Sequence, residues 1–123
     1  MLVSVCMPVY QGSTFIEAAL HAVLQQTYRH VEILISLDKS VDEEESEAIV
    51  RRVEAQFPAA RIELFRQKVR LNWIRNTNFL LNRARGGYIA ILPHDDWIIN
   101  RPLRIAEHGA RPPSLAQFLG NCL

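Results

Sequence analysis

Cysteine is scarce in this chain of 123 residues, which contains only Cys6 and Cys122. One possible pair is not a disulfide framework, and no CxxC or paired-histidine spacing indicates a structural zinc site. We therefore expect a reducing, cytoplasmic setting, with a peripheral position at the inner face of the membrane as an alternative. Cys6 lies inside an apolar run, so we expect it to be a small buried thiol.

Long hydrophobic runs are missing as well. No apolar segment approaches the roughly 18–20 residues that a helix needs to span a bilayer. The first ten residues, MLVSVCMPVY, have no basic region and are typical of a strand rather than of a signal peptide. We expect no transmembrane segment.

Glycine-rich phosphate motifs are also missing from the sequence. Neither GxGxxG nor GxxxxGK[ST] occurs, which argues against a dinucleotide-dependent oxidoreductase and against a P-loop NTPase. GxSxG does not occur either, which weakens the case for a hydrolase.

A strong net charge is lacking, since the formal charge is +1. General nucleic-acid binding is therefore poorly supported. The charge is uneven, however: residues 1–62 have 5 Lys/Arg and 9 Asp/Glu, whereas residues 63–123 have 9 and 4. The span 66–85 carries six cations and no acid, which would suit a polyanionic ligand or, alternatively, a solvated helix face.

The sequence does contain a regular alternation of apolar runs and amphipathic segments. The pattern predicts strands at 2–7, 31–37, 61–65 and 88–92, and helices at 14–27, 40–57 and 72–85. Short apolar strands between amphipathic helices favour one α/β domain, a Rossmann-like three-layer α/β/α arrangement with a mostly parallel sheet.

Local signals predict where some of these elements begin and end. Pro8 is expected to end the first strand. Thr14 and Glu17 have capping-box spacing, which predicts a helix start near residue 14. Trp73, Leu80, Leu81 and Ala84 are expected together on one side of the third helix.

Polar residues follow three of the predicted strands. In open parallel sheets, ligands bind beyond the carboxyl ends of the strands, so these residues are expected at one edge. They are Pro8, Tyr10, Gln11 and Gly12 after the first strand, Asp38, Lys39, Ser40 and Asp42 after the second, and His94, Asp95 and Asp96 after the fourth.

Each of these features has two interpretations. Tyr10 is either a platform on which a base stacks or a strand-end aromatic that covers the core. Asp38 either accepts a hydrogen bond from a ligand or caps the second helix. Asp95 and Asp96 either bind a divalent cation beside substrate phosphates or form a turn or helix cap. His94 is expected to be a bystander.

The pattern resembles the nucleotide-binding half of a family 2 glycosyltransferase with the GT-A fold. The resemblance covers roughly residues 2–105. It rests on three blocks in order, VSVCMPVYQGSTFIEAALHAVLQQTYRHVEILISLDKSVD, RNTNFLLNRARGGYIAILPHDDW and NRPLRI. It implies a nucleotide-diphospho-sugar donor, with a UDP-sugar expected first, and an acceptor saccharide or glycolipid in polysaccharide or glycoconjugate assembly.

By motif position, the resemblance also implies roles for individual residues. Pro8, Val9 and Tyr10 would line the base pocket, and Asp38 would contact the base. The donor phosphates and sugar would lie near Arg75.

The acidic pair Asp95 and Asp96 would form the part of the expected site around the metal ion. Asp95 would face the ribose or sugar, and Asp96 would bind the Mn²⁺ or Mg²⁺ that bridges the diphosphate. Pro93 stands where the family's motif begins with an aspartate. In the loop after the second strand, Leu37 and Lys39 replace the family's first aspartate and its glycine.

Length is the largest departure from the family. Residues 1–105 are expected to form the donor-binding domain and residues 106–123 an atypical C-terminal tail. Glu107 is the only acid after Asp96, in a context unlike the family's general base, so we expect a truncated, incomplete enzyme. The alternatives are a non-catalytic binding or assembly module that pairs with another chain, with homo-oligomers in view, and a phosphoacceptor receiver domain.

Overall fold

The computed structural model describes residues 2–26, 28–92 and 104–107, the last four by their backbone. In chain order the elements are β1 Val3–Val9, α1 Ile16–Leu24, β2 Val31–Leu37, α2 Glu43–Gln56, β3 Arg61–Arg66, α3 Asn72–Leu81, β4 Tyr88–Ile91 and β5 Arg104–Glu107. From β1 to β4 this order confirms the predicted alternation of strands and helices, whereas β5 was not predicted.

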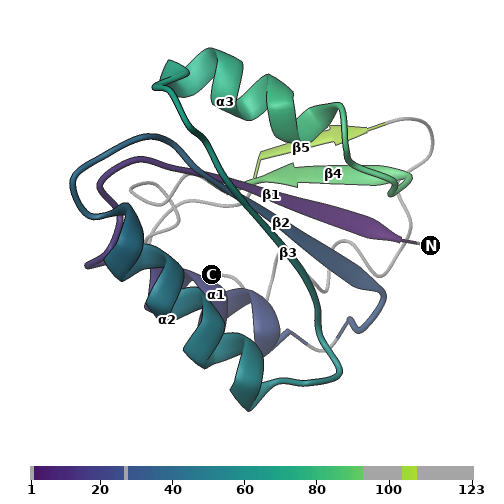
Figure 1. Cartoon of the computed structure of the whole chain (residues 1–123). Coiled ribbons are helices and arrows are strands. Elements are labelled where there is room, and N and C mark those ends of the chain that lie inside the picture. Colours follow the sequence, from purple (N-terminus) through teal and green to yellow (C-terminus); the bar gives the residue numbers. More distant parts are fainter. Residues whose placement is uncertain (1, 27, 93–103, 108–123) are drawn as a thin grey trace.

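The described strands form one sheet in the order β3-β2-β1-β4-β5. β1 pairs in parallel with β2 and β4, and β2 pairs in parallel with β3, whereas β5 runs antiparallel to β4. Helices α1 and α2 cover one face of the sheet and α3 covers the other (Figure 1). The predicted three-layer, mostly parallel α/β fold is therefore confirmed.

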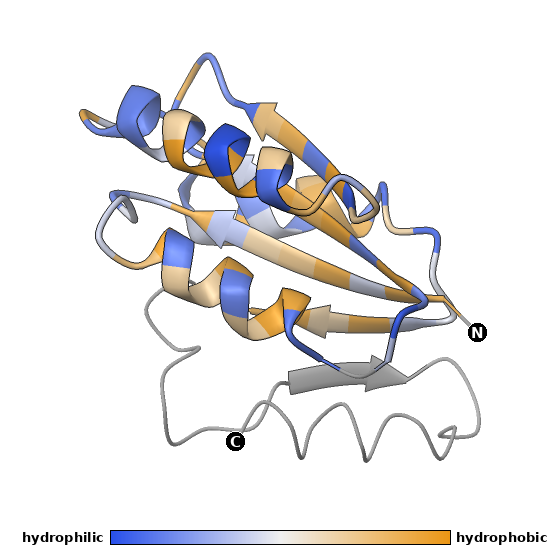
Figure 2. Cartoon of the chain, turned by 90° about the horizontal axis from the view of Figure 1, so that it is seen from below, coloured by the Kyte–Doolittle hydropathy of each residue, from blue (hydrophilic) through white to orange (hydrophobic). Residues whose placement is uncertain are grey.

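The two faces of the sheet carry two separate apolar clusters. Alternate residues of β1 and β2 pack under α1 and α2, whereas Cys6, Leu34 and Ile89 of the strands pack against Leu80 of α3. The central strands are mostly hydrophobic along their length (Figure 2). Burial, with a smaller contribution from the negative charge of Glu32, raises the pKa of the Cys6 thiol to about 12, so this thiol stays protonated at neutral pH.

Two predictions about the helices are wrong. No side-chain cap begins α1; instead the N–H groups of Phe15 and Ile16 donate to the carbonyl of Gly12, so the Thr14–Glu17 capping box does not form. Helix α3 ends at Leu81, and Trp73 on its first turn is 55 % exposed rather than inward. No helix in residues 2–26 or 28–92 has the length and apolar character needed to cross a bilayer.

Pro8 does not end the first strand, because β1 continues through it to Val9 on the side of β2. Pairing with β4 stops at Cys6 opposite Ile91. The carbonyl of Cys6 accepts from the N–H of Leu92, so backbone alternation turns the nitrogen of Pro8 toward β4 as well. That nitrogen has no hydrogen to donate, so Pro8 interrupts only the hydrogen-bond ladder with β4 and leaves the ladder with β2 unbroken.

Gly86 allows the chain to pass very close to the start of β1. A Cβ at this position would lie 2.6 Å from the carbonyl oxygen of Leu2, 2.7 Å from Ser4 Oγ and 2.8 Å from the backbone nitrogen of Ser4. Two of these three atoms belong to the backbone, which cannot give way without moving β1.

Gly86→Ala is therefore expected to lower the free energy of unfolding by about 1–3 kcal/mol, the usual cost of overpacking. Urea unfolding at neutral pH would measure it. Adding Ser4→Ala should not restore stability, because both backbone contacts remain. A Gly86→Ala protein with the wild-type unfolding midpoint would contradict this account.

Candidate functional site

The candidate site lies where β1 and β2 end and α3 begins. The N–H of Asp38 donates to the carbonyl of Val9 (2.8 Å), and the N–H of Gln67 donates to the carbonyl of Leu37 (2.9 Å). These bonds place the chain after β1, the chain after β2 and the segment 67–72 side by side, at the edge where β1, β2 and β3 end (Figure 1).

Asp38 joins this edge of the sheet to α3. Its Oδ1 accepts from the N–H groups of Lys39 (2.9 Å) and Leu71 (2.7 Å), and its Oδ2 accepts from the N–H of Asn72 (2.9 Å). The first N–H groups of a helix have no partner within the helix, and a carboxylate suits them. Asp38 is only 2 % exposed.

One of the two interpretations of Asp38 is therefore wrong. It does not cap the second helix: the N-cap of α2 is Asp42, which makes no side-chain cap bond, and Asp38 binds the start of α3 instead. Asn72 there has a φ of 68°, a left-handed conformation that asparagine tolerates better than most residues. Oδ2 has accepted one hydrogen bond, so it retains capacity for a second donor.

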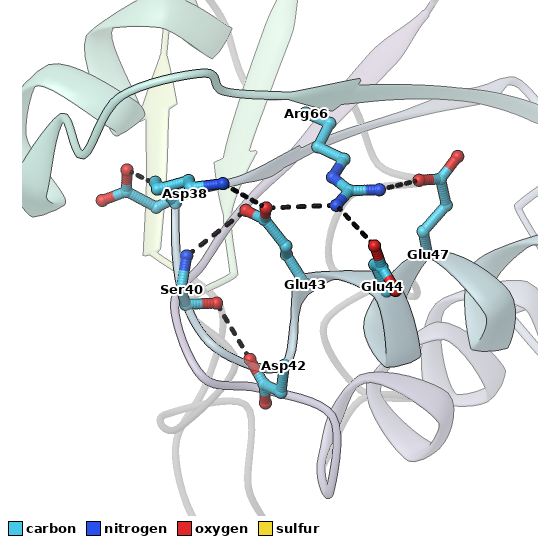
Figure 3. A network of polar contacts seen from close by, with 8 residues as sticks. Asp38, Ser40, Asp42, Glu43, Glu44, Glu47 and Arg66 are labelled. Atoms are coloured by element: carbon cyan, nitrogen blue, oxygen red, sulfur yellow. Dashed lines mark hydrogen bonds and ion pairs between the residues drawn. The ribbon is translucent and has the colours of Figure 1, made fainter.

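Asp42 and Glu43, the acidic residues that follow Asp38, accept hydrogen bonds from residues nearby. Glu43 accepts hydrogen bonds from the N–H of Ser40 (3.3 Å) and from Arg66 Nη2 (3.1 Å), as Figure 3 shows, and from Lys39 Nζ (2.9 Å). The hydrogen bond from Lys39 is the main cause that holds the pKa of Glu43 below its usual value, against the effect of burial. Lys39, a departure from the family pattern, therefore has a structural partner.

Asp42 belongs to the same network. Its carboxylate accepts from the N–H of Ser13 (3.1 Å) and from Ser40 Oγ (2.9 Å). Burial alone would raise the pKa of Asp42, but these hydrogen bonds outweigh it and the pKa is lowered. Asp42 thus ties the loop after β2 to the loop after β1.

Tyr10 carries an arginine on its ring. The guanidinium carbon of Arg70 lies 4.0 Å from the ring centroid, which is a cation–π contact. Tyr10 is in neither of the two apolar clusters formed by the described residues. Arg70 was missed as an individual residue in the sequence; its only signal was the acid-free basic span.

Arg75 lies on the first turns of α3 and binds backbone. Its Nε donates to the carbonyl of Leu71 (2.9 Å) and its Nη2 to the carbonyl of Arg70 (3.2 Å). The Arg75 side chain therefore binds carbonyl groups of the turn that precedes α3, while Asp38 binds N–H groups of the same turn. The role of Arg75 toward donor phosphates remains a prediction.

The expected metal site cannot be built from the described part of the chain. No group of three or more His, Cys, Asp or Glu side chains there is placed to hold an ion. Asp38, Asp42 and Glu43 already accept hydrogen bonds from amides, a hydroxyl or cations, so they are poor candidates for metal ligands. Pro93, His94, Asp95 and Asp96 lie outside the described residues.

A pocket of about 520 Å³ lies at the opposite end of the sheet, around the last residues of α1 and α2 and the first of β2 and β3. It contains none of the predicted site residues. Its walls include Val23, Phe57 and Ile33.

A family model described as "Glycosyl transferase family 2" matches residues 4–104. The chain is 34 % identical over 101 residues to the UDP-Glc:alpha-D-GlcNAc-diphosphoundecaprenol beta-1,3-glucosyltransferase WfgD of Escherichia coli. That match covers 81 % of this chain and 38 % of the relative.

Solved structures share the fold. The mannosyltransferase PcManGT of Pyrobaculum calidifontis, in complex with GDP-Man and Mn²⁺, matches with a TM-score of 0.70 and 26 % identity over 76 % of this chain and 27 % of its own. TarS 1-349 of S. aureus, in complex with UDP-GlcNAc, matches at 0.64 and 19 % identity over 77 % of this chain and 27 % of its own, a likeness of fold alone.

The chain thus spans less than half the length of these relatives. The family match nevertheless covers most of its residues and includes every strand and helix that forms the candidate edge. This chain belongs to glycosyl transferase family 2.

Proposed function

We propose that this chain is the donor-binding part of a glycosyltransferase, which binds a nucleotide-diphospho-sugar together with Mn²⁺ or Mg²⁺. The observation that carries the proposal is the meeting of Tyr10 and Asp38 with the basic segment before α3 at the carboxyl edge of a parallel sheet. Ligands of such sheets bind at this edge. A UDP-sugar is the donor to test first, because the relative WfgD is named for UDP-Glc.

The roles follow from the chemistry of each side chain. Tyr10 offers a ring on which a base stacks, and Pro8 and Val9 form the adjoining wall. Asp38 Oδ2 accepts one N–H from the base in addition to that of Asn72. Arg75 lies close enough to the same turn to face the diphosphate.

The acidic pair completes the donor site. Asp95 faces the ribose or sugar, and Asp96 holds the divalent cation. The bound cation would neutralise the diphosphate as it leaves the sugar. In the complete enzyme, the sugar passes to a hydroxyl of a saccharide or glycolipid acceptor; we assign no general base to this chain.

Isothermal titration with UDP in the presence of Mn²⁺ tests this proposal. We expect measurable heat that disappears when the metal is removed with EDTA. Asp96→Asn should weaken binding at least about tenfold, since even indirect partners of a metal site cost 10–100-fold when replaced. Glu54→Gln, which alters only an exposed ion pair on α2, is the matched control.

Three outcomes would count against the proposal. The first is no heat change up to millimolar UDP, and the second is equal affinity with and without metal. The third is an Asp96→Asn protein that binds UDP as tightly as the Glu54→Gln control.

A further inference from the structure

We propose that Arg70 is a displaceable occupant of the nucleotide site. In the free chain its guanidinium covers the ring of Tyr10; on donor binding the base takes this ring face and the guanidinium turns to the diphosphate. The inference rests on the proposed function and assigns to Arg70 a positioning and specificity role that the sequence pattern did not indicate.

The first observation is that Arg70 already occupies the place where a base would stack. At 4.0 Å from the ring centroid, the guanidinium lies in direct contact with the ring. Asp38, the other expected base contact, is only 2 % exposed and is bound to the N–H of Leu71, the residue next to Arg70. A base that stacks on this face of the ring reaches both residues only after the Arg70 side chain has moved.

The second observation is that the side chain can move while its backbone stays. The carbonyl of Arg70 accepts from Arg75 Nη2, and the following N–H is bound by Asp38. The Arg70 side chain is exposed, and among residues 2–26 and 28–92 it forms no ion pair with a carboxylate. Within the described part of the chain, the contact with the Tyr10 ring is the side-chain interaction that must be exchanged.

Two other arginines, Arg66 and Arg85, are held by carboxylates instead of by a ring. Arg66 binds Glu43 and Glu47, and Arg85 binds Glu32 and Glu63, so each would lose charge pairs on moving. A stacked base is a stronger partner for an aromatic ring than an exposed cation is. A guanidinium released beside a diphosphate gains a charge-assisted, bidentate contact. The exchange therefore improves both contacts.

The test compares a nucleoside with its diphosphate. Arg70→Ala removes the competitor for Tyr10 and also the cation for the phosphates. We expect uridine to bind about 2–5-fold more tightly to Arg70→Ala than to the wild type, and UDP with Mn²⁺ to bind about 5–10-fold more weakly. A purely structural role for Arg70 would change both affinities in the same direction.

Two control variants separate this effect from general electrostatics. Arg83→Ala removes an arginine that also lies on an aromatic ring, 3.6 Å from the centroid of Phe79, but far from the candidate site along α3. Lys68→Ala removes a cation from the same segment as Arg70. Neither should tighten uridine binding, and circular dichroism should show that all three variants are folded.

A direct readout follows the Arg70 side chain itself. In NMR spectra of the wild type, the Arg70 side-chain protons should show a ring-current shift that disappears in Tyr10→Leu and on saturation with UDP and Mn²⁺. If UDP binds and this shift persists, or if Arg70→Ala binds uridine no better than the wild type, the inference is wrong and the proposed function stands. If neither wild type nor Arg70→Ala binds uridine or UDP, both are overturned.

Discussion

Asp38→Ala is expected to lower the free energy of unfolding by about 2–4 kcal/mol, because hydrogen bonds to a charged group are strong and buried donors left without a partner are costly. The carboxylate accepts three backbone N–H groups, two of them at the start of α3, and is 2 % exposed. Alanine leaves those donors without an acceptor, and Asn72 loses the bond that holds its left-handed conformation.

The measurements are urea unfolding and hydrogen exchange at the amides of Leu71 and Asn72. Both amides should exchange much faster in the variant, while those of β2 keep their protection. Asp42→Ala is the matched control: it removes the same side chain from the same loop, but one that is only partly buried, and should cost about 1 kcal/mol. Equal midpoints for Asp38→Ala and wild type would disprove a structural role for Asp38.

Glu32→Ala, at the other end of the sheet, is expected to lower the free energy of unfolding by a similar amount, about 2–4 kcal/mol. Glu32 has a side chain that is 1 % exposed. It accepts from Ser4 Oγ (2.5 Å), from the N–H of Arg85 (2.8 Å) and from the Arg85 guanidinium (2.9 Å). Its removal leaves buried donors unpaired beneath the chain that enters β4.

The same residue predicts a pH dependence. Burial alone would raise the pKa of Glu32, but the bonds from Ser4 and Arg85 outweigh it, so the folded-state pKa lies below the usual value. The ionised carboxylate therefore stabilises the fold fully above the unfolded pKa of about 4.3, and this contribution is lost as the pH falls through the folded pKa.

Urea unfolding at a series of pH values would measure this contribution. The difference between wild type and Glu32→Gln should be largest near neutral pH and should shrink below about pH 4.3. Glu63→Gln, whose half-exposed side chain also pairs with Arg85, should change stability by no more than about 1 kcal/mol. A gap between wild type and Glu32→Gln that stays constant with pH would exclude an ionic role for Glu32.

Much of the fold follows from patterns that are local in the sequence. Apolar runs separated by amphipathic segments predict the order of strands and helices, because a strand buried on both faces must be apolar throughout. Boundary signals were less reliable. The Thr14–Glu17 spacing formed no cap, because α1 begins at Ile16 with Phe15, not Thr14, in the N-cap position. Trp73 faces outward although its type suggested the core.

The candidate site likewise has residues that the sequence predicts and partners that only the structure reveals. Tyr10 and Asp38 could be selected from the sequence, since they follow apolar strands of a parallel sheet. Their partners could not: Arg70 and Leu71 are separated from them by 60 and 33 positions, and only the crossing of segment 67–72 over the strand ends brings them together. Whether a side chain is free to bind a ligand depends on such contacts between distant residues, and no local sequence pattern contains them.

The sequence by itself therefore determined the fold class, the family resemblance and the edge of the sheet at which ligands are expected. All three depend on residue types repeated at short spacing. The tertiary structure alone decided that Asp38 holds the start of α3, that Pro8 continues β1 on one side while ending its ladder on the other, and that Arg70 covers Tyr10. Each of these depends on which distant groups meet, and that is set by packing of the whole sheet and its helices.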